Sequence, residues 1–401
     1  MLHFLTNSLP FKQVGYTVRA QQIARAQKAA SLDPHMVTRA GFPMNEGFIG
    51  AQAEETVDGV PYYRLAPELP PGMRLDQLLE MNVGEASRLI ERLRPAAIHP
   101  TSNHPNAQVA LALRARYGLP VIYEVRGFLE ETWLSKVGPD AASSDKYRLS
   151  RANELACMQA ADAIVTLSET MKADMVARGV EANKIVVVPN AVEIERFPVP
   201  VRDDRLAARL GLRQGEIVIG YISSFVEYEG IRYLIEAGAH LRARGRPVKM
   251  LLVGDGNQRA ALEQRARELS VEDVVIFTGR VPHQEILNYY SIIDVFVIPR
   301  TSARVSQLVT PLKPYEAMAT QRAIVVSKVG ALLEIVREGE TGLAFEPEDS
   351  EDLADVVEPL LADPLERARL GEAARRWVIE NRTWTQNGQR YRALYERLSV
   401  A

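Results

Sequence analysis

The sequence contains one cysteine, Cys157, in 401 residues, which excludes an internal disulfide and permits a reducing compartment. No apolar run reaches the roughly 20 residues that a membrane-spanning helix needs. The N-terminal stretch MLHFLTNSLPFKQVGY is too short and too polar for a secretory signal, and it is predicted to form a first strand and loop. The net charge of −3 argues against nucleic-acid partners. These absences favour a cytoplasmic protein, with at most peripheral contact at the inner face of a membrane through a helix such as 86–94.

Apolar segments alternate with helical patterns throughout the chain. At 47% hydrophobic and 25% charged residues, the composition is ordinary for an α/β protein of two domains. The Val/Ile/Leu runs are continuous, which indicates strands buried on both faces of parallel sheets. We therefore predict two doubly wound, Rossmann-like domains that face each other across a cleft, the default ligand site. The predicted strands are residues 2–5, 36–39, 60–65, 96–99, 120–125, 163–167, 185–190, 217–222, 249–253, 274–278, 295–299 and 323–327.

The domain boundary is predicted where this alternation is interrupted. Residues 191–204 lack periodicity and contain two prolines. The first domain is accordingly predicted to cover residues 1–195 and the second residues 196–381. The last helix, within 382–401, is amphipathic and is expected to pack back on the first domain.

The stretch from Pro299 to Gly330 carries the chemistry that organises the rest of the prediction. A basic loop precedes a short helix, 314–319, whose first turn would present free amides beside the positive end of the helix dipole, a setting that suits phosphate. Arg304 and Lys313 would add charge-assisted donors. Glu316 lies one turn into the helix, where its carboxylate would accept two hydrogen bonds from a ribose diol. Two interpretations remain open on these residues: a nucleotide diphosphate site, or an ordinary βα loop with a solvated basic edge.

Six segments, mostly in the second half, occur in the order and spacing of a known family. The segments are Val188–Glu193, Gly220–Ile222, Leu252–Gly256, Phe277–Val281, Pro314–Ala319 and Gly339–Leu343. With them the chain resembles a family-4 glycosyltransferase of the GT-B fold over nearly its whole length. The resemblance implies a retaining enzyme that moves a sugar from a nucleotide-diphosphate sugar to a hydroxyl of a sugar, lipid-linked or small-molecule acceptor, in bacterial polysaccharide, glycoconjugate or glycosylated-metabolite synthesis. It implies no cofactor.

The resemblance also implies roles for particular residues of the second domain. Glu316 would bind the ribose hydroxyls, with Leu312 and Lys313 directly before it in the nucleotide site. Gly279 with Arg280 and Val281 would meet the base through backbone groups. Gly254 would let the chain approach the nucleotide, although both glycines also suit tight turns after a strand.

The chain departs from the family pattern at the donor site. The family usually has a glutamate eight residues before the equivalent of Glu316, whereas Leu308 stands here beside Gln307, an uncharged side chain that would hydrogen-bond a sugar hydroxyl. The family also favours an arginine and a lysine after the first strand of this domain. Ser224 and Glu229 occupy those places. We therefore expect the missing cations to be replaced from the other side of the diphosphate by Arg300, Arg304 and Lys313.

Residues of the first domain are candidates for the reacting end of the donor and for the acceptor. Gly15 lies in the loop that approaches the reacting sugar in the family, or simply turns the chain. His99 ends a strand and His104 follows it; either would bond a donor-sugar hydroxyl or phosphate, or be structural. Arg126 would face the acceptor or the leaving phosphate, or form a structural pair with Glu124.

No metal site is predicted, because the six histidines lack ligand spacing and there is no Asp-x-Asp, the metal-holding motif of the other major glycosyltransferase fold. The helix N-terminus and basic side chains would neutralise the leaving group instead. The acceptor hydroxyl would attack on the face that the diphosphate leaves, with a phosphate oxygen taking the proton.

Two other functions remain open for this chain: a non-catalytic nucleotide-sugar-binding protein and a GT-B epimerase. A dehydrogenase is disfavoured because the motif Gly-x-Gly-x-x-Gly is missing.

Overall fold

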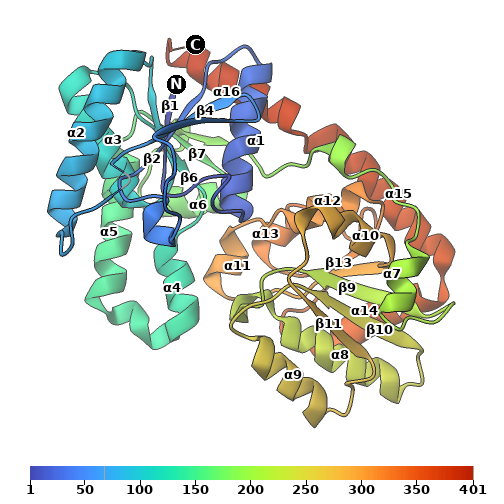
Figure 1. The fold of residues 1–401 in the computed structure, drawn as a ribbon. Helices are drawn as coiled ribbons and strands as arrows, with labels where there is room; N and C mark the ends of the chain where they lie inside the picture. The colour runs from blue at the N-terminus through green and yellow to red at the C-terminus, as the bar shows by residue number, and fades with distance from the viewer. Residues whose placement is uncertain (67, 401) are drawn as a thin grey trace. The chain divides into compact units, whose positions relative to one another are not determined.

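The computed structural model describes residues 1–66 and 68–400, and it divides the chain into two compact units (Figure 1). Unit 1 comprises Met1–Asn190 and the segment from Trp384 onward, and unit 2 comprises Ala191–Thr383. The sequence placed these boundaries after residue 195 and before residue 382. The structure places them where the two connecting segments pair: the Val192 amide donates to the Arg382 carbonyl oxygen (3.0 Å), and Val192 forms a parallel bridge with Thr383.

Unit 1 is built on a largely parallel sheet. Five strands lie in the order β3-β4-β2-β1-β5, and three more in the order β6-β7-β8. Parallel bridges between Ile98 and Val121 and between Thr101 and Glu124 connect β5 to β6. Among the strands of unit 1 that the structure describes, only β3 is antiparallel to its neighbour. The strands are β1 Leu2–Leu5, β2 His35–Thr38, β3 Glu54–Val57, β4 Val60–Arg64, β5 Ile98–Pro100, β6 Ile122–Val125, β7 Ala163–Thr166 and β8 Ile185–Val187.

Helices follow the strands of unit 1, and the last helix of the chain returns to it. Every residue of β1, β6 and β7 is buried, which explains their unbroken apolar runs. Helix α16 packs on α1, as Figure 1 shows. The contact is close, because a Cβ on Gly388 would lie 2.4 Å from the Ala26 carbonyl oxygen. The helices are α1 Gly15–Ala29, α2 Leu75–Leu93, α3 His104–Tyr117, α4 Leu129–Val137, α5 Asp145–Ala160, α6 Glu169–Ala177 and α16 Trp384–Arg397.

Unit 2 is a six-stranded sheet in the order β11-β10-β9-β12-β13-β14, and every pairing in it is parallel. The strand order reverses between β9 and β12. Ligands of such sheets bind beyond the carboxyl ends of the strands at that reversal. The strands are β9 Ile217–Ile222, β10 Val248–Val253, β11 Val275–Gly279, β12 Val295–Ile298, β13 Ala323–Ser327 and β14 Leu343–Phe345. The helices are α7 Asp204–Arg209, α8 Ile231–Ala243, α9 Arg259–Glu268, α10 Ile286–Ser291, α11 Arg304–Leu308, α12 Lys313–Ala319, α13 Gly330–Leu333, α14 Ser350–Ala362 and α15 Pro364–Asn381.

The predicted fold class, two doubly wound α/β domains, is confirmed, but five short elements were not predicted. Helix α7 and strand β14 lie where no helix or strand was assigned from the sequence. Strand β3 lies in a stretch expected to be irregular, α4 fills an unassigned region, and α11 interrupts the expected basic loop after β12. In the part of the chain that the structure describes, no helix is both long and apolar enough to span a membrane.

Candidate functional site

The loops after β9 and β12 meet at the strand-order reversal of unit 2. Gly230 adopts a positive φ of 66°, and a Cβ there would lie 1.8 Å from the Pro299 carbonyl oxygen, so only glycine allows this approach. The Thr301 amide donates to the Tyr228 carbonyl oxygen (3.0 Å). The carboxyl edge of the sheet is therefore a fixed platform at the point where the fold favours a ligand.

Arg300 belongs to this platform. Its Nη2 donates to Glu229 Oε1 (2.6 Å), its Nη1 donates to the Val309 carbonyl oxygen (2.8 Å), and the residue is 6% exposed. Burial alone would lower the pKa of Arg300, but Glu229 outweighs burial and raises it. The Tyr221 hydroxyl also donates to Glu229. The charge of Arg300 is balanced by Glu229, the residue that stands in place of a family cation, and the contact of Arg300 with the diphosphate stays a prediction.

Glu316 projects from the first turn of α12 and is held by two neighbours. Its Oε2 accepts hydrogen bonds from Tyr290 Oη (2.9 Å) and from Lys313 Nζ (2.8 Å). Among the described residues, no hydrogen-bond partner is found for Oε1. The side chain is 12% exposed. The carboxylate is thus oriented by one oxygen while the other remains able to accept a hydrogen bond, as the ribose prediction requires.

Tyr290 and His283 are site residues that the sequence did not reveal. Tyr290, on α10, is fully buried, and burial followed by the charge of Glu316 raises its pKa well above the usual value. His283, Gln284 and Glu285 form a single 3-10 turn that follows the loop after β11. Burial lowers the pKa of His283, while Glu316 raises it and Lys313 lowers it, so the imidazole lies within the field of both charges. The only sequence signal was their place in the second domain's strand–helix order.

The first turn of α12 offers a phosphate fewer amides than the sequence suggested. Pro314 has no N–H, and the Tyr315 amide donates to the Leu312 carbonyl oxygen (3.2 Å). Lys313, with 29% of its side chain exposed, remains as a nearby cation. Arg304 is exposed at the start of α11. Side chains, more than backbone amides, would therefore have to neutralise a diphosphate here.

The predicted glycines bring the strand ends together. Gly254 has a φ of 137°, and a Cβ there would lie 1.9 Å from the Ser223 carbonyl oxygen. Its amide donates to the Gly279 carbonyl oxygen (3.0 Å). Contact within the protein thus accounts for both glycines. Ser224 and Arg280 are exposed and Val281 is half-buried at the same edge of the sheet.

The segment before Glu316 is fixed from within unit 2. Gln307 Oε1 accepts a hydrogen bond from the Gly330 amide (2.8 Å), which ties α11 to the start of α13. Leu308, where the family has a glutamate, is 5% exposed. Leu312 is half-buried and is the N-cap residue of α12. Gln307 therefore acts in the structure as a cap for α13, and its predicted contact with a sugar stays a prediction for its amide nitrogen.

In unit 1, His99 is buried in a hydrogen-bond network. The residue is 0% exposed, its Nδ1 lies 2.6 Å from Tyr395 Oη, and its Nε2 lies 3.1 Å from Glu124 Oε2. Burial lowers the pKa of His99 against the opposing effect of Glu124. Helix α16 covers His99, because Tyr395 belongs to that helix, and the contact of His99 with the donor stays a prediction.

Arg126 forms the structural pair that the sequence left as one alternative. Its Nε donates to Glu124 Oε1 (2.9 Å), and its Nη1 donates to the Tyr16 carbonyl oxygen (3.0 Å), next to exposed Gly15 at the start of α1. Arg126 Nη2 is buried and has no hydrogen-bond partner in the described part of the chain. Burial alone would raise the pKa of Glu124, but Arg126 and Arg19 hold it well below the usual value. Arg126 is thus anchored through Nε and retains a spare donor.

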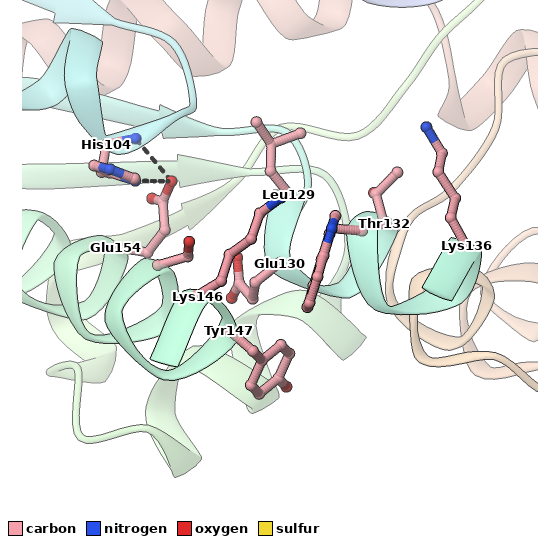
Figure 2. Close-up of a pocket in the computed structure, with 10 residues that line it drawn as sticks. His104, Leu129, Glu130, Thr132, Lys136, Lys146, Tyr147 and Glu154 are labelled. Carbon is pink, nitrogen blue, oxygen red and sulfur yellow. Dashed lines mark hydrogen bonds and ion pairs between the residues drawn. The ribbon is translucent and has the colours of Figure 1, made fainter. Parts of the chain in front are cut away.

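His104 lies apart from the Glu124 network, at the N-terminus of α3. Its backbone amide donates to Glu154 Oε1 (2.7 Å), and its Nδ1 lies 3.5 Å from the same oxygen, as the dashed lines in Figure 2 show. Within residues 1–66 and 68–400, no group of three or more histidine, cysteine or acidic side chains is arranged to hold a metal ion.

Two Rossmann-like units built on parallel sheets are the architecture of GT-B proteins. Residues 203–377 match the family described as glycosyl transferases group 1, and residues 14–191 match the glycosyl transferase 4-like domain. The chain belongs to the family-4 glycosyltransferases of the GT-B fold.

Individual relatives agree with this assignment. The chain is 30% identical over 226 residues to a 2-deoxystreptamine glucosyltransferase of Streptomyces kanamyceticus (56% of this chain, 57% of the relative). It is 31% identical over 206 residues to a GDP-mannose-dependent phosphatidylinositol monomannoside mannosyltransferase of Mycolicibacterium smegmatis (51% of this chain, 54% of the relative). The chain spans about half the length of the curated relatives it matches.

Solved structures share the fold over the full length. A sucrose-phosphate synthase from Thermosynechococcus elongatus superimposes with a TM-score of 0.81 at 23% identity, covering 99% of this chain and 98% of that chain. The Anabaena protein HepE, solved in complex with UDP-glucose, superimposes with a TM-score of 0.76 at 19% identity, covering 100% of this chain and 99% of that chain. At these identities the likeness establishes the GT-B fold.

Proposed function

We propose that the protein is a retaining glycosyltransferase that moves a sugar from a nucleotide-diphosphate sugar to an acceptor hydroxyl in the cytoplasm. The observation that carries the proposal is the Glu316 carboxylate. Tyr290 and Lys313 hold its Oε2, while its Oε1 has no partner among the described residues, at the strand edge where a parallel α/β sheet binds its ligand. A carboxylate with one oriented and one available oxygen suits a vicinal diol.

The residues around Glu316 have complementary tasks in this proposal. Glu316 accepts the ribose hydroxyls, and the half-exposed Lys313 ammonium turns from Glu316 toward the diphosphate, where it stabilises the charge of the leaving group. Backbone groups of exposed Arg280 and half-buried Val281 meet the base. The acceptor hydroxyl attacks the anomeric carbon on the face that the diphosphate leaves, and a phosphate oxygen takes the proton.

The names of relatives support a nucleotide sugar as the donor. HepE was solved with UDP-glucose, and the mycobacterial relative is named as GDP-mannose-dependent. Because these two names differ in both base and sugar, we propose the donor class and leave the base and the sugar open. The acceptor class is a sugar, lipid-linked or small-molecule alcohol, and no cofactor is proposed.

The first test is turnover of uridine and guanosine diphosphate sugars by the purified protein. We expect release of the nucleoside diphosphate, slowly to water and faster with an acceptor. Glu316→Gln keeps the shape and the Tyr290 hydrogen bond but removes the negative charge, so we expect kcat/KM for the donor to fall about 10- to 100-fold. Glu346→Gln, at an exposed carboxylate paired with Lys328, is the matched control and should turn over normally. Equal kinetics in wild type and Glu316→Gln would refute the site.

A non-catalytic nucleotide-sugar-binding protein is the second candidate, and Leu308 favours it. The family usually has a glutamate at this position near the donor sugar, and here an apolar side chain, 5% exposed, fills it. Binding of nucleoside diphosphate sugars by calorimetry, with no hydrolysis or transfer over hours and with many acceptors, would establish the binding protein and reject the enzyme.

A further inference from the structure

A cavity of about 310 Å³ lies in unit 1, away from the Glu124 network. Helices α4 and α5 and the first residue of α3 form its walls (Figure 2). Its volume is at the lower end of the range for small-molecule sites, which suits one ring and excludes an extended chain. His104, which the sequence singled out and the Glu124 network does not include, lies at its rim beside Glu154.

One wall of this cavity presents a buried carboxylate that is only half satisfied. Glu130 Oε1 accepts a hydrogen bond from Arg178 Nη1 (2.7 Å), and the Glu130 side chain is 0% exposed. Glu130 Oε2 is buried and has no hydrogen-bond partner in the described part of the chain. An unpaired buried oxygen costs free energy, so its persistence in a cavity wall points to a ligand that donates a hydrogen bond to it.

Aromatic and basic side chains also line this cavity. Trp133 on α4 and Tyr147 on α5 supply flat apolar surface, and both are half-buried. Lys146 Nζ lies 4.6 Å from the centre of the Trp133 ring, and Lys136 lines the cavity on the same helix as Trp133. Both lysines are exposed, so their side chains are able to move away from the ring and donate to a bound molecule.

These contacts exclude three classes of ligand. An anion would meet the buried carboxylates of Glu130 and Glu154, and a cation would meet the two lysines. A wholly apolar molecule would leave Glu130 Oε2 without a partner. A neutral ring with hydroxyl groups suits every one of these side chains. Its C–H face packs on Trp133, one hydroxyl donates to Glu130, and other hydroxyls accept from Lys136 or Lys146.

We propose that this cavity is a carbohydrate subsite that holds one neutral monosaccharide ring. On the proposed function, that ring is a unit of the acceptor, so the acceptor would be a glycan or a glycoside. Only the identification of the ring as a unit of the acceptor rests on the glycosyltransferase assignment. Binding of the ring itself requires neither the donor nor the chemistry in unit 2.

The test is binding of methyl glycosides of common neutral hexoses to the full-length protein, measured by saturation-transfer NMR and isothermal titration. A single ring in a site of this size should bind with about millimolar affinity. Trp133→Ala removes the stacking surface. Glu130→Gln replaces the unpaired acceptor by an amide donor, while the amide oxygen of the new side chain would still accept from Arg178. Each change should weaken binding about tenfold or more. Trp133→Phe keeps an aromatic surface and is the matched control, with affinity within a few-fold of wild type.

The outcomes separate this inference from the proposed function. Should Glu130→Gln fold poorly, Trp133→Ala still decides, because Trp133 is not fully buried. Saturable binding that both variants weaken supports the subsite, even in a protein that fails to hydrolyse any nucleotide sugar. Donor turnover with no saturable binding of any methyl glycoside, or with binding that Trp133→Ala and Glu130→Gln leave unchanged, overturns the subsite and leaves the glycosyltransferase proposal intact.

Discussion

At the scale of single residues, the ion pair of Glu229 and Arg300 fixes the platform of unit 2. The two side chains are 9% and 7% exposed, and they join the loops after β9 and β12. Glu229→Ala would leave a buried guanidinium without its counter-charge, so we expect a loss of about 3–5 kcal/mol in the free energy of unfolding. Urea denaturation measures it. Glu229→Gln, which keeps one acceptor, should lose less, and equal stability of Glu229→Ala and wild type would show that the pair is not formed.

Tyr290 is a positioning residue for Glu316. Tyr290→Phe removes the hydroxyl that donates to Glu316 Oε2 (2.9 Å) and leaves the buried ring in place. One hydrogen bond is worth about 1 kcal/mol, so we expect the donor KM to rise about fivefold with kcat nearly unchanged. Steady-state kinetics separate the two constants. The nearby Tyr289→Phe, whose hydroxyl is not bonded to Glu316, is the control; a fall in kcat with an unchanged KM would contradict the positioning role.

These residues also show which features of a site are predictable from the sequence and which are not. The place of Glu316 one turn into a helix was predictable, because a strand–loop–helix pattern fixes it. The partners of Arg300 and His99 were not, because each is set by a residue remote in the chain: Glu229 for Arg300, and Tyr395 for His99. A charged or polar residue at a strand end signals a site, but only the fold decides whether its side chain faces a ligand or the core.

At the scale of secondary-structure elements, a buried network holds α16 against α1 and the sheet of unit 1. Gln27 of α1 links His3 of β1 (2.8 Å) to Tyr395 of α16 (3.1 Å), and Tyr395 continues to His99 of β5 (2.6 Å). Tyr391, also of α16, donates to Glu124 Oε2 (2.9 Å). The last helix is therefore attached by polar contacts as well as by the apolar face that the sequence predicted.

This network makes the stability of unit 1 depend on pH. Burial lowers the pKa of His3 well below its usual value, and His99 and the N-terminal amine lower it further. Burial also lowers the pKa of His99, against the opposing effect of Glu124. His3 faces His99 and the N-terminal amine with Glu124 opposing them, and His99 faces Glu124 and Arg126. The unfolded chain then binds more protons below about pH 6.5, so stability is complete above that pH and falls on acidification, by up to about 1.4 kcal/mol per pH unit for each histidine.

The measurement is urea unfolding between pH 8 and pH 5. His3→Gln keeps a donor for Gln27 but cannot titrate, so its stability should fall less steeply with pH than that of wild type. His240→Gln, at a histidine of α8 outside the network, is the control and should keep the wild-type slope. A stability that rises on acidification over this range would contradict the assignment of neutral buried histidines.

The elements that were not predicted are short, and a short element leaves little pattern in the sequence. Strand β3 has four residues with alternate ones exposed, and α11 has five residues, too few for a hydrophobic period to be visible. Helix α4, of nine residues, owes its start to two glutamates in the first turn, a favourable placement at the positive end of a helix dipole. The long buried strands were predictable because burial on both faces dictates their composition. The carbohydrate subsite was not, since α4, which forms one of its walls, was not predicted.

At the scale of the whole molecule, the chain forms two units with separate apolar cores, Met1–Asn190 with the segment from Trp384, and Ala191–Thr383. Each proposed ligand belongs to one unit: a nucleoside diphosphate to unit 2 and a neutral glycoside to unit 1. A ligand that binds only a folded state raises its melting temperature by mass action. We therefore expect calorimetry of the full chain to show two transitions that respond to different ligands.

Variants of each unit assign the two transitions. Glu229→Ala should lower the transition of unit 2, and His3→Gln should alter the pH dependence of the other. A nucleoside diphosphate at 100 times its Kd adds about 2.7 kcal/mol to unit 2, and this increase should be reduced in Glu316→Gln. A methyl glycoside should raise only the unit 1 transition, and Trp133→Ala should abolish that rise. If both ligands raised the same transition, one of the two sites would be assigned to the wrong unit, because neither set of lining residues crosses from one core to the other.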